Sequence, residues 1–323
     1  MTPEQQAELT DTTARYLAGV ETLKASTEAS VQSVWAASPD WYDAAVIAAL
    51  SAEAASASLA GQQAITGAAE EFATATVSIL TDTARVAIPR VDIPPVRNGA
   101  PLTLVHSRTA ERFKRAFSQG ASSDEAYLQA LKRAGGLART DMTLRQRAAQ
   151  IVLLDELGVK KYRRVVQPEL SETGSCGLCV AAADRVYGTD MLMPIHPPSC
   201  NCIVMPIIGS LDPGKTMNKE DLDRIYADAG GSTRKQDLVN TRYKVNEHGE
   251  YGLVLSRAKD DFRGPSQLAL EDDPARAARM LTQALPVLDR LEAAGGPQGP
   301  LSYQRELVAR LRRIVGTPQA SAA

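Results

Sequence analysis

Apolar residues recur at helical spacing along most of this chain. Between Glu4 and Trp35 the large apolar residues lie roughly along one helical stripe, formed by Leu9, Tyr16, Val20, Leu23, Val31 and Val34. A second helix is predicted from Pro39, capped by Ser38, to near Ile88. Alanine-rich faces bury little area per residue. We therefore expect residues 1–88 to form an elongated helical hairpin that either needs a partner surface or packs as an edge of its own chain.

A proline-rich stretch, residues 89–101, follows the hairpin and excludes regular helix, so we place a domain boundary within it. Three helices are then predicted. The first opens at Ser107 or Thr109, the second runs from Ser122 or Ser123 to Gly135-Gly136, and the third runs from Thr140-Asp141 to Gly158. The charge run KKYRR, Lys160 to Arg164, is expected to be a solvated strand edge, with contact to DNA or an acidic partner as the alternative.

The C-terminal region, residues 211–323, has a mixed pattern. We predict a short helix after Asn218, a β-hairpin from Thr241–Val245 and Tyr251–Leu255, a helix opened by Asp273-Pro274 and kinked at Pro286, and a last helix from Ser302. His106 is expected at the edge of a core and His248 in a loop. The predicted fold class is mainly α with a small α+β module.

That module is marked by cysteine. All four cysteines lie between Cys176 and Cys202, and His196 lies among them. A CxxC pair followed by H-x-x-x-C-x-C suits a tetrahedral zinc site, for which there are five candidate ligands and four places. The preferred set is Cys176, Cys179, His196 and Cys200, with Cys202 as a substitute. Two disulfides, or inert buried thiols, remain alternatives.

These residues also carry a resemblance. The stretch 165–209, VVQPELSETGSCGLCVAAADRVYGTDMLMPIHPPSCNCIVMPIIG, resembles the core of the phage Mu protein F-like minor head proteins, in the version encoded by tailed phages of actinobacteria. The matching positions are Cys176, Cys179, Gly188, Pro194, His196, Pro197, Cys200, Cys202 and Pro206. The chain departs from the pattern in placing both Pro198 and Ser199 between His196-Pro197 and Cys200. Residues 102–210 would form the Mu F-like domain.

The resemblance implies a minor capsid protein of the virion, made in the host cytoplasm and located at the portal vertex or inside the head. Its partners would be the portal protein, the major capsid protein, or both. The alternative is a capsid maturation protease with Cys179 or Cys200 as nucleophile, His196 as base, and Asp184 or Asp190 as the group that orients the base. Zinc ligation would occupy the same thiols and imidazole, so the two interpretations compete.

Charge is distributed in two opposed blocks. Residues 1–89 carry a formal net charge of -8 and residues 90–165 one of +8. Such blocks could attract each other, another copy in a homo-oligomer, or, for the basic block, packaged DNA. No signal peptide and no membrane-spanning run is apparent, since the longest apolar run, Ala44 to Leu50, is too short. We expect deletion of residues 1–89 to leave a folded, soluble remainder from about Leu102.

Overall fold

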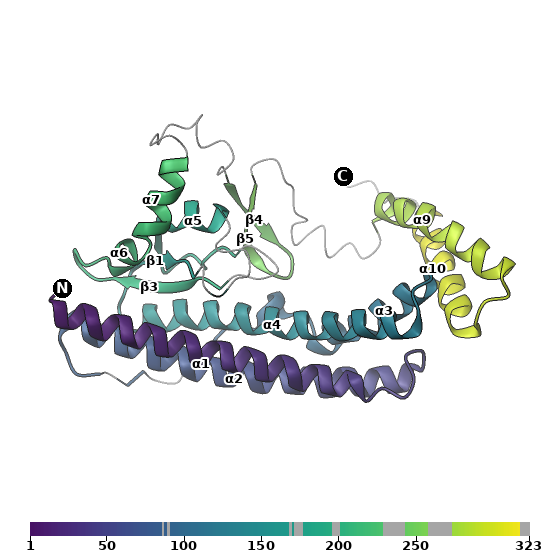
Figure 1. Ribbon diagram of the computed structural model, residues 1–323, viewed down its shortest axis with the longest axis horizontal. Coiled ribbons are helices and arrows are strands. Elements are labelled where there is room, and N and C mark those ends of the chain that lie inside the picture. The colour runs from purple at the N-terminus through teal and green to yellow at the C-terminus, as the bar shows by residue number, and fades with distance from the viewer. Residues whose placement is uncertain are drawn as a thin grey trace, which may run out of the picture. The chain divides into compact units, whose positions relative to one another are not determined.

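The computed structural model describes residues 1–85, 87–88, 91–167, 170, 177–195, 201–228, 243–257 and 273–316. Helices dominate, and the described strands form a three-stranded sheet and a two-stranded hairpin (Figure 1). At this level the predicted fold class is confirmed. Two compact units divide the chain. The first comprises Met1–Thr27, Ser58–Ala100 and Ala138–Pro265, and the second comprises Glu28–Ala57, Pro101–Leu137 and Ser266–Ala323.

Three long helices contribute to both units: α1 (Pro3–Ala36), α2 (Ala44–Thr81) and α4 (Ser123–Glu156). A helix of this length extends roughly 50 Å, which is enough to supply side chains to two separate cores. The compact units therefore differ from the predicted segments, because the hairpin of residues 1–88 is shared between them. One division does fall at Ala100–Pro101, inside the predicted linker.

The first helix agrees with its prediction, whereas both ends of the second differ. The chain enters α2 at Ala44, and the Asp43 carboxylate accepts a hydrogen bond from the Val46 amide at 2.9 Å. Asp43 rather than Ser38 therefore caps the helix. The helix ends at Thr81 instead of near Ile88, and Asp82 follows with a left-handed φ of 52°. A residue in this conformation is a common helix terminator.

The predicted helix stop at Gly135-Gly136 is wrong, because α4 passes through both glycines without a break. A Cβ at Gly135 would lie 2.5 Å from the Glu28 carboxylate and 2.6 Å from the Gln32 amide. Gly135 therefore allows α1 and α4 to approach closely within the second unit. Helix α3 (Leu102–Ser118) also begins earlier than the predicted Ser107 or Thr109. His106 lies on it and is fully buried.

The first unit contains an antiparallel sheet of order β2-β1-β3, formed by β1 (Lys161–Val165), β2 (Val186–Gly188) and β3 (Ile203–Ile207). The charge run therefore lies on the central strand, and Tyr162, Arg163 and Arg164 are buried. The expectation of a solvated strand edge is wrong. Three short helices accompany the sheet: α5 (Gly177–Ala183), α6 (Pro213–Met217) and α7 (Lys219–Asp228).

The predicted β-hairpin is confirmed as β4 (Tyr243–His248) and β5 (Gly252–Arg257). A parallel bridge between Ile195 and Val254 joins it to the segment before His196. His248 is the last residue of β4, and its Nδ1 accepts hydrogen bonds from the amides of Glu250 and Tyr251. This histidine therefore organises the turn, close to the loop role expected for it.

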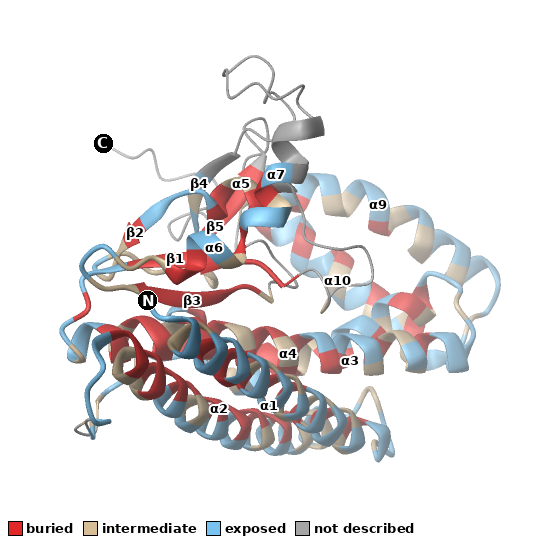
Figure 2. Ribbon diagram, turned by 60° about the vertical axis from the view of Figure 1, so that its left-hand side comes forward, coloured by how far each residue is buried: buried red, intermediate tan, exposed pale blue. Residues whose placement is uncertain are grey.

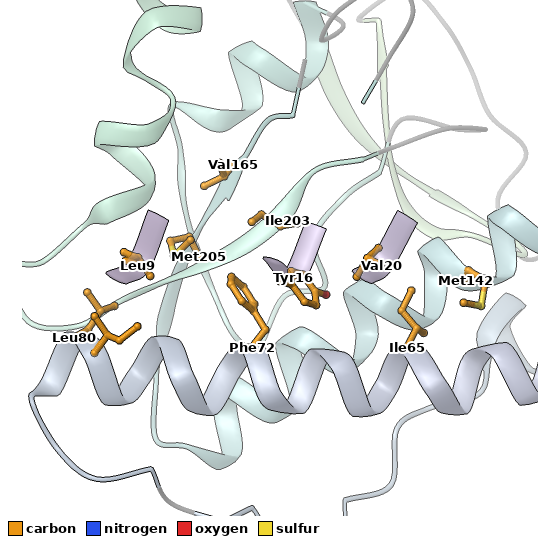
Figure 3. Close-up of a cluster of buried hydrophobic side chains, with 11 residues drawn as sticks. Leu9, Tyr16, Val20, Ile65, Phe72, Leu80, Met142, Val165, Ile203 and Met205 are labelled. Atoms are coloured by element: carbon orange, nitrogen blue, oxygen red, sulfur yellow. The ribbon is translucent and has the colours of Figure 1, made fainter. Parts of the chain in front are cut away.

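One hydrophobic core joins the N-terminal hairpin to the sheet in the first unit (Figure 3). Its buried members come from α1, α2, α4, β1 and β3: Leu9, Tyr16, Val20, Ile65, Phe72, Ile79, Leu80, Met142, Val165, Ile203 and Met205. The Tyr16 and Phe72 rings stack at 4.2 Å between centroids. In this structure the hairpin of residues 1–88 therefore packs against its own chain, which was the second of the two possibilities.

The predicted linker is also anchored in the first unit. Val96–Gly99 forms a 3₁₀ turn in which Arg97 has a positive φ and a side chain removed from solvent. Its guanidinium pairs with Asp141 at 2.5 Å and with Glu250 at 3.0 Å. The other Asp141 oxygen accepts a hydrogen bond from Ser58 at 3.0 Å. The segment therefore ties α2, α4 and the β4–β5 turn together.

The second unit is helical in its described part. Phe113 of α3 and Trp41 stack at 4.7 Å, and α3 and α4 pack through Ala116, Ala126 and Ala130. Helices α9 (Pro274–Ala293) and α10 (Gln298–Gly316) form an antiparallel hairpin whose core is Ala277, Ala284, Val308, Leu311 and Ile314 (Figure 1). Asp273 caps α9 as predicted, Pro286 lies inside it, and α10 begins before the predicted Ser302.

Among the described helices, α2 is the one that is long and apolar enough to cross a membrane, judged by length and composition alone. Many of its residues are alanines, and Figure 2 shows both buried and exposed residues along this helix. Leu59, which is 49% exposed, is its exposed large apolar residue. A core helix of a water-soluble protein passes the same test, so this finding is weak evidence for a membrane role.

Candidate metal centre

Two of the five predicted ligands lie among the described residues, and both are buried cysteines. Cys179 belongs to α5 and is 5% exposed, whereas Cys202 directly precedes β3 and is 9% exposed. Cys176, His196 and Cys200 lie outside the described residues. The structure therefore places the two described members of the cluster in the interior of the first unit.

A buried arginine brings these two thiols together. Arg164 of β1 is fully buried, and its Nη1 lies 3.5 Å from the Cys179 sulfur and 3.6 Å from the Cys202 sulfur. Its Nη2 donates to the Pro194 carbonyl. Because both sulfurs contact the same nitrogen, residues from α5 and from the start of β3 meet at one point. They are separated by more than twenty positions in the sequence.

The alternation of the central strand explains how Arg164 reaches this position. Successive side chains of a strand point to opposite faces. Val165 joins the core shared with α1 and α2, so the side chain of Arg164 projects to the other face. Tyr162 lies on the same face as Arg164, and its hydroxyl donates to the Met191 carbonyl at 2.8 Å. One short strand thus separates an apolar core from the thiol cluster.

Neighbouring polar side chains fix the strand that carries Arg164. The Asn218 amide donates to the Arg164 carbonyl at 2.7 Å and accepts from the Val166 amide at 3.0 Å. Arg163 pairs with Asp212 at 2.6 Å and donates to the carbonyls of Ala183 and Asp184 at the end of α5. These contacts connect α5, α6 and the start of α7 to β1, so the position of Cys179 relative to Arg164 is well determined.

The donor set fits a thiolate-binding metal. Thiolates are the form of cysteine that binds metal, and a cation at hydrogen-bond distance stabilises a thiolate. In a tetrahedral zinc site with bonds of about 2.3 Å, two sulfurs lie about 3.8 Å apart. The shared contact with Arg164 Nη1 is compatible with that spacing. Among the described residues, no group of three or more histidine, cysteine or acidic side chains lies close enough together to hold a metal ion. A four-ligand site would therefore need two further ligands, for which Cys176, His196 and Cys200 are the candidates.

The geometry is less suited to the protease alternative. Cys179 is almost completely buried, and a nucleophile must be reached by a polypeptide substrate. Asp184 is exposed and contributes its backbone carbonyl to Arg163, and Asp190 is also exposed. The other nucleophile, Cys200, and the proposed base, His196, lie outside the described residues.

Sequence reasoning missed Arg164, Arg163 and Asn218 as parts of this cluster. The available signal was the charge run itself, because two adjacent arginines within an apolar strand pattern must point to opposite faces. The charge of residues Lys160 to Arg164 favours a solvated edge, whereas the alternation of side chains along a strand would have placed one arginine on each face. Asn218 was noted as the residue before a short helix, whereas its side chain binds the backbone of β1.

Comparison with known proteins adds no relative to this description. No protein-family model matches the chain, and neither a curated protein nor a solved structure matches it.

Proposed function

We propose that this chain is a minor head protein of a tailed phage, which acts by binding other proteins at the portal vertex or on the inner face of the capsid. The observation that carries the proposal is the Cys/His/Pro motif of residues 165–209. Its support from the fold is the way Arg164 gathers Cys179 and Cys202 behind a central strand. Such a cluster serves as a rigid structural core and leaves the surface for binding partners.

We further propose that the module holds one structural zinc ion. Cys179 and Cys202 would be ligands together with two of Cys176, His196 and Cys200. This set differs from the preference based on sequence, in which Cys202 was only a substitute. The zinc would supply cross-links between α5 and the start of β3 when bound. Arg164 would donate N–H···S hydrogen bonds to both thiolates, the kind of outer contact that orients metal ligands.

The composition of purified particles tests the role. If the proposal is correct, quantitative mass spectrometry of gradient-purified phage heads finds the chain at a low, fixed ratio to the portal protein. Heads assembled without its gene would then be defective or unstable. Absence of the chain from mature heads, with normal heads formed without it, would contradict the proposal.

A matched set of variants separates binding from catalysis. Cys179→Ala, Cys200→Ala and His196→Ala are expected to reduce folding and incorporation together, because structural metal contributes directly to folding. A protease predicts a different result, in which each variant folds and enters the head while the major capsid protein stays uncleaved. That second result would contradict the proposed binding role and would show that the chain is a protease.

A further inference from the structure

A basic groove lies within the second unit, between α3, the start of α4 and the α9–α10 hairpin. It has a volume of about 350 Å³. Five arginines line it: Arg108, Arg112, Arg115, Arg133 and Arg310. Several of its other lining residues, such as Gln283 and Gln304, are neutral and polar. The groove is therefore strongly positive, although the whole chain has a formal net charge of -2.

Glu111 is the one acidic side chain among the described residues that line the groove. Glu111 contacts Lys114 at 3.5 Å. Burial, and secondarily the negative charge of the nearby Glu111, raises the pKa of Tyr303. Lys114 lies 6.0 Å from the centre of the Tyr303 ring. Among the described lining residues, one carboxylate therefore stands beside five arginines.

The arrangement of the arginines suits a chain of phosphates. Arg108, Arg112 and Arg115 have the spacing i, i+4, i+7, which places them on one face of α3 over about 10 Å. Arg112 and Arg115 are exposed. Successive phosphates of one DNA strand advance about 3.4 Å along the helix axis, so this row spans several of them. Arginine also binds phosphate oxygens with two parallel N–H donors.

The groove is held in shape by contacts within the unit. Arg290 of α9 donates to the Ser118 carbonyl at the end of α3, at 3.1 Å. Gln304 of α10 donates to the Ala284 carbonyl of α9 at 2.8 Å. A preorganised groove loses less entropy on binding than a flexible basic tail.

We propose that this groove binds the phosphate backbone of nucleic acid without reading its sequence. Charge complementarity selects a polyanion. The planar arginine forks favour phosphate. Among the described lining residues Tyr303 is the one aromatic side chain, and a single ring is too few for a base-stacking platform. The assignment of packaged DNA as the natural ligand rests on the proposed function, whereas the phosphate site itself does not.

The test uses the full-length protein and a fluorescent DNA duplex of about 30 base pairs, titrated by anisotropy over a range of salt concentrations. The double variant Arg112→Gln/Arg115→Gln is expected to bind at least about tenfold more weakly at about 0.1 M salt, and the slope of log affinity against log salt should fall by about two. The matched control Lys132→Gln/Arg312→Gln removes two charges from exposed residues outside the groove lining and should leave both values nearly unchanged.

Three results would overturn the proposal. The first is that wild-type protein fails to bind the duplex at low salt. The second is that the groove variant and its control lose affinity equally. The third is that poly-glutamate displaces the duplex as well as unlabelled DNA does at equal charge, which would identify the groove as a site for acidic protein segments. DNA binding measured in this way is independent of whether the chain is found in phage heads, so failure of the two proposals can be distinguished.

Discussion

Arg164 shows most clearly what a single buried residue does in this molecule. Its guanidinium is fully removed from solvent, yet it contacts two thiols and a backbone carbonyl that come from three different parts of the chain. Burying a cation is costly unless its hydrogen bonds are made. Arg164 therefore both depends on the cluster and holds it together.

Replacing Arg164 by methionine should lower the free energy of unfolding by about 2–4 kcal/mol, because the Pro194 carbonyl loses its donor in a buried place and the two thiols lose a shared partner. Urea unfolding followed by circular dichroism measures this change. The control is Arg15→Met, since the Arg15 side chain is 69% exposed and should change stability by no more than about 0.5 kcal/mol. Equal stability of both variants would show that the guanidinium does not organise the cluster.

Tyr42 gives a prediction of pH dependence. Burial, and secondarily the charge of Asp40, raises the pKa of Tyr42 to about 12. Among the described residues, its hydroxyl has no hydrogen-bond partner. The unfolded tyrosine ionises near pH 10, so the stability that neutral Tyr42 provides is complete below about pH 10 and is lost as the pH rises to about 12.

Thermal unfolding across this pH range should therefore show a smaller alkaline decrease for Tyr42→Phe than for the wild-type protein. At neutral pH the variant should be as stable as the wild type or slightly more so, because it removes a buried hydroxyl without a partner. Some alkaline decrease remains, since the pKa values of Tyr16, Tyr162 and Tyr303 are also raised by burial. An identical pH profile for both proteins would mean that Tyr42 ionises freely in the folded state.

At the scale of elements, periodicity predicted most of the helices and the β4–β5 hairpin, but local signals placed several ends incorrectly. Glycine is the clearest case. Gly135-Gly136 was interpreted as a helix stop, whereas Gly135 serves close packing against Glu28 and Gln32. Whether a glycine ends a helix or admits a neighbouring helix depends on residues far away in the sequence. Local patterns carry no information about them.

Two glycines of α2 test this packing role. A Cβ at Gly61 would lie less than 3 Å from Thr27 Cγ2 and Met142 Sδ, whereas one at Gly67 would meet nothing within 4 Å. Thr27 is held by a hydrogen bond from its hydroxyl to the Leu23 carbonyl at 2.8 Å, so it cannot easily move away. Gly61→Ala should destabilise the protein by about 1–3 kcal/mol through overpacking.

The same substitution at Gly67 is the matched control and should stabilise the protein by about 0.5–1 kcal/mol, because alanine is the better helix former. Chemical unfolding of the two variants beside the wild type provides the comparison. Stabilisation by Gly61→Ala would show that α1, α2 and α4 are not closely packed at this point.

At the scale of the whole molecule, the sequence predicted the fold class and located the thiol cluster but not the residue at its centre. Cysteine spacing is a local signal, so it could be found without a structure. Arg164 reaches the cluster only because β1 pairs with both β2 and β3, which join positions well separated in the chain. The sequence left open whether the hairpin of residues 1–88 needs a partner surface or packs on its own chain, because its core neighbours in β1 and β3 lie far away in the sequence.

The sequence predicts that deletion of residues 1–89 leaves a folded, soluble remainder, and the structure leads us to expect the opposite. Removing residues 1–89 takes Leu9, Tyr16, Val20, Ile65 and Phe72 away from the core of the first unit. Met142, Val165, Ile203 and Met205 would then be exposed to water. Apolar burial contributes about 25 cal/mol of free energy per Å². The free energy lost with such a core is expected to exceed the free energy of unfolding of most domains, about 5–15 kcal/mol.

We therefore expect the chain from residue 90 onward to aggregate, or to bind a hydrophobic dye and lose its near-ultraviolet circular dichroism, when expressed alone. Supplying residues 1–89 as a separate chain in the same cells should restore solubility, because the two fragments can rebuild one core. This rescue distinguishes loss of the core from a general effect of truncation. A truncated chain that stays soluble and unfolds cooperatively without its complement would mean that α1 and α2 only cover a core that is complete without them.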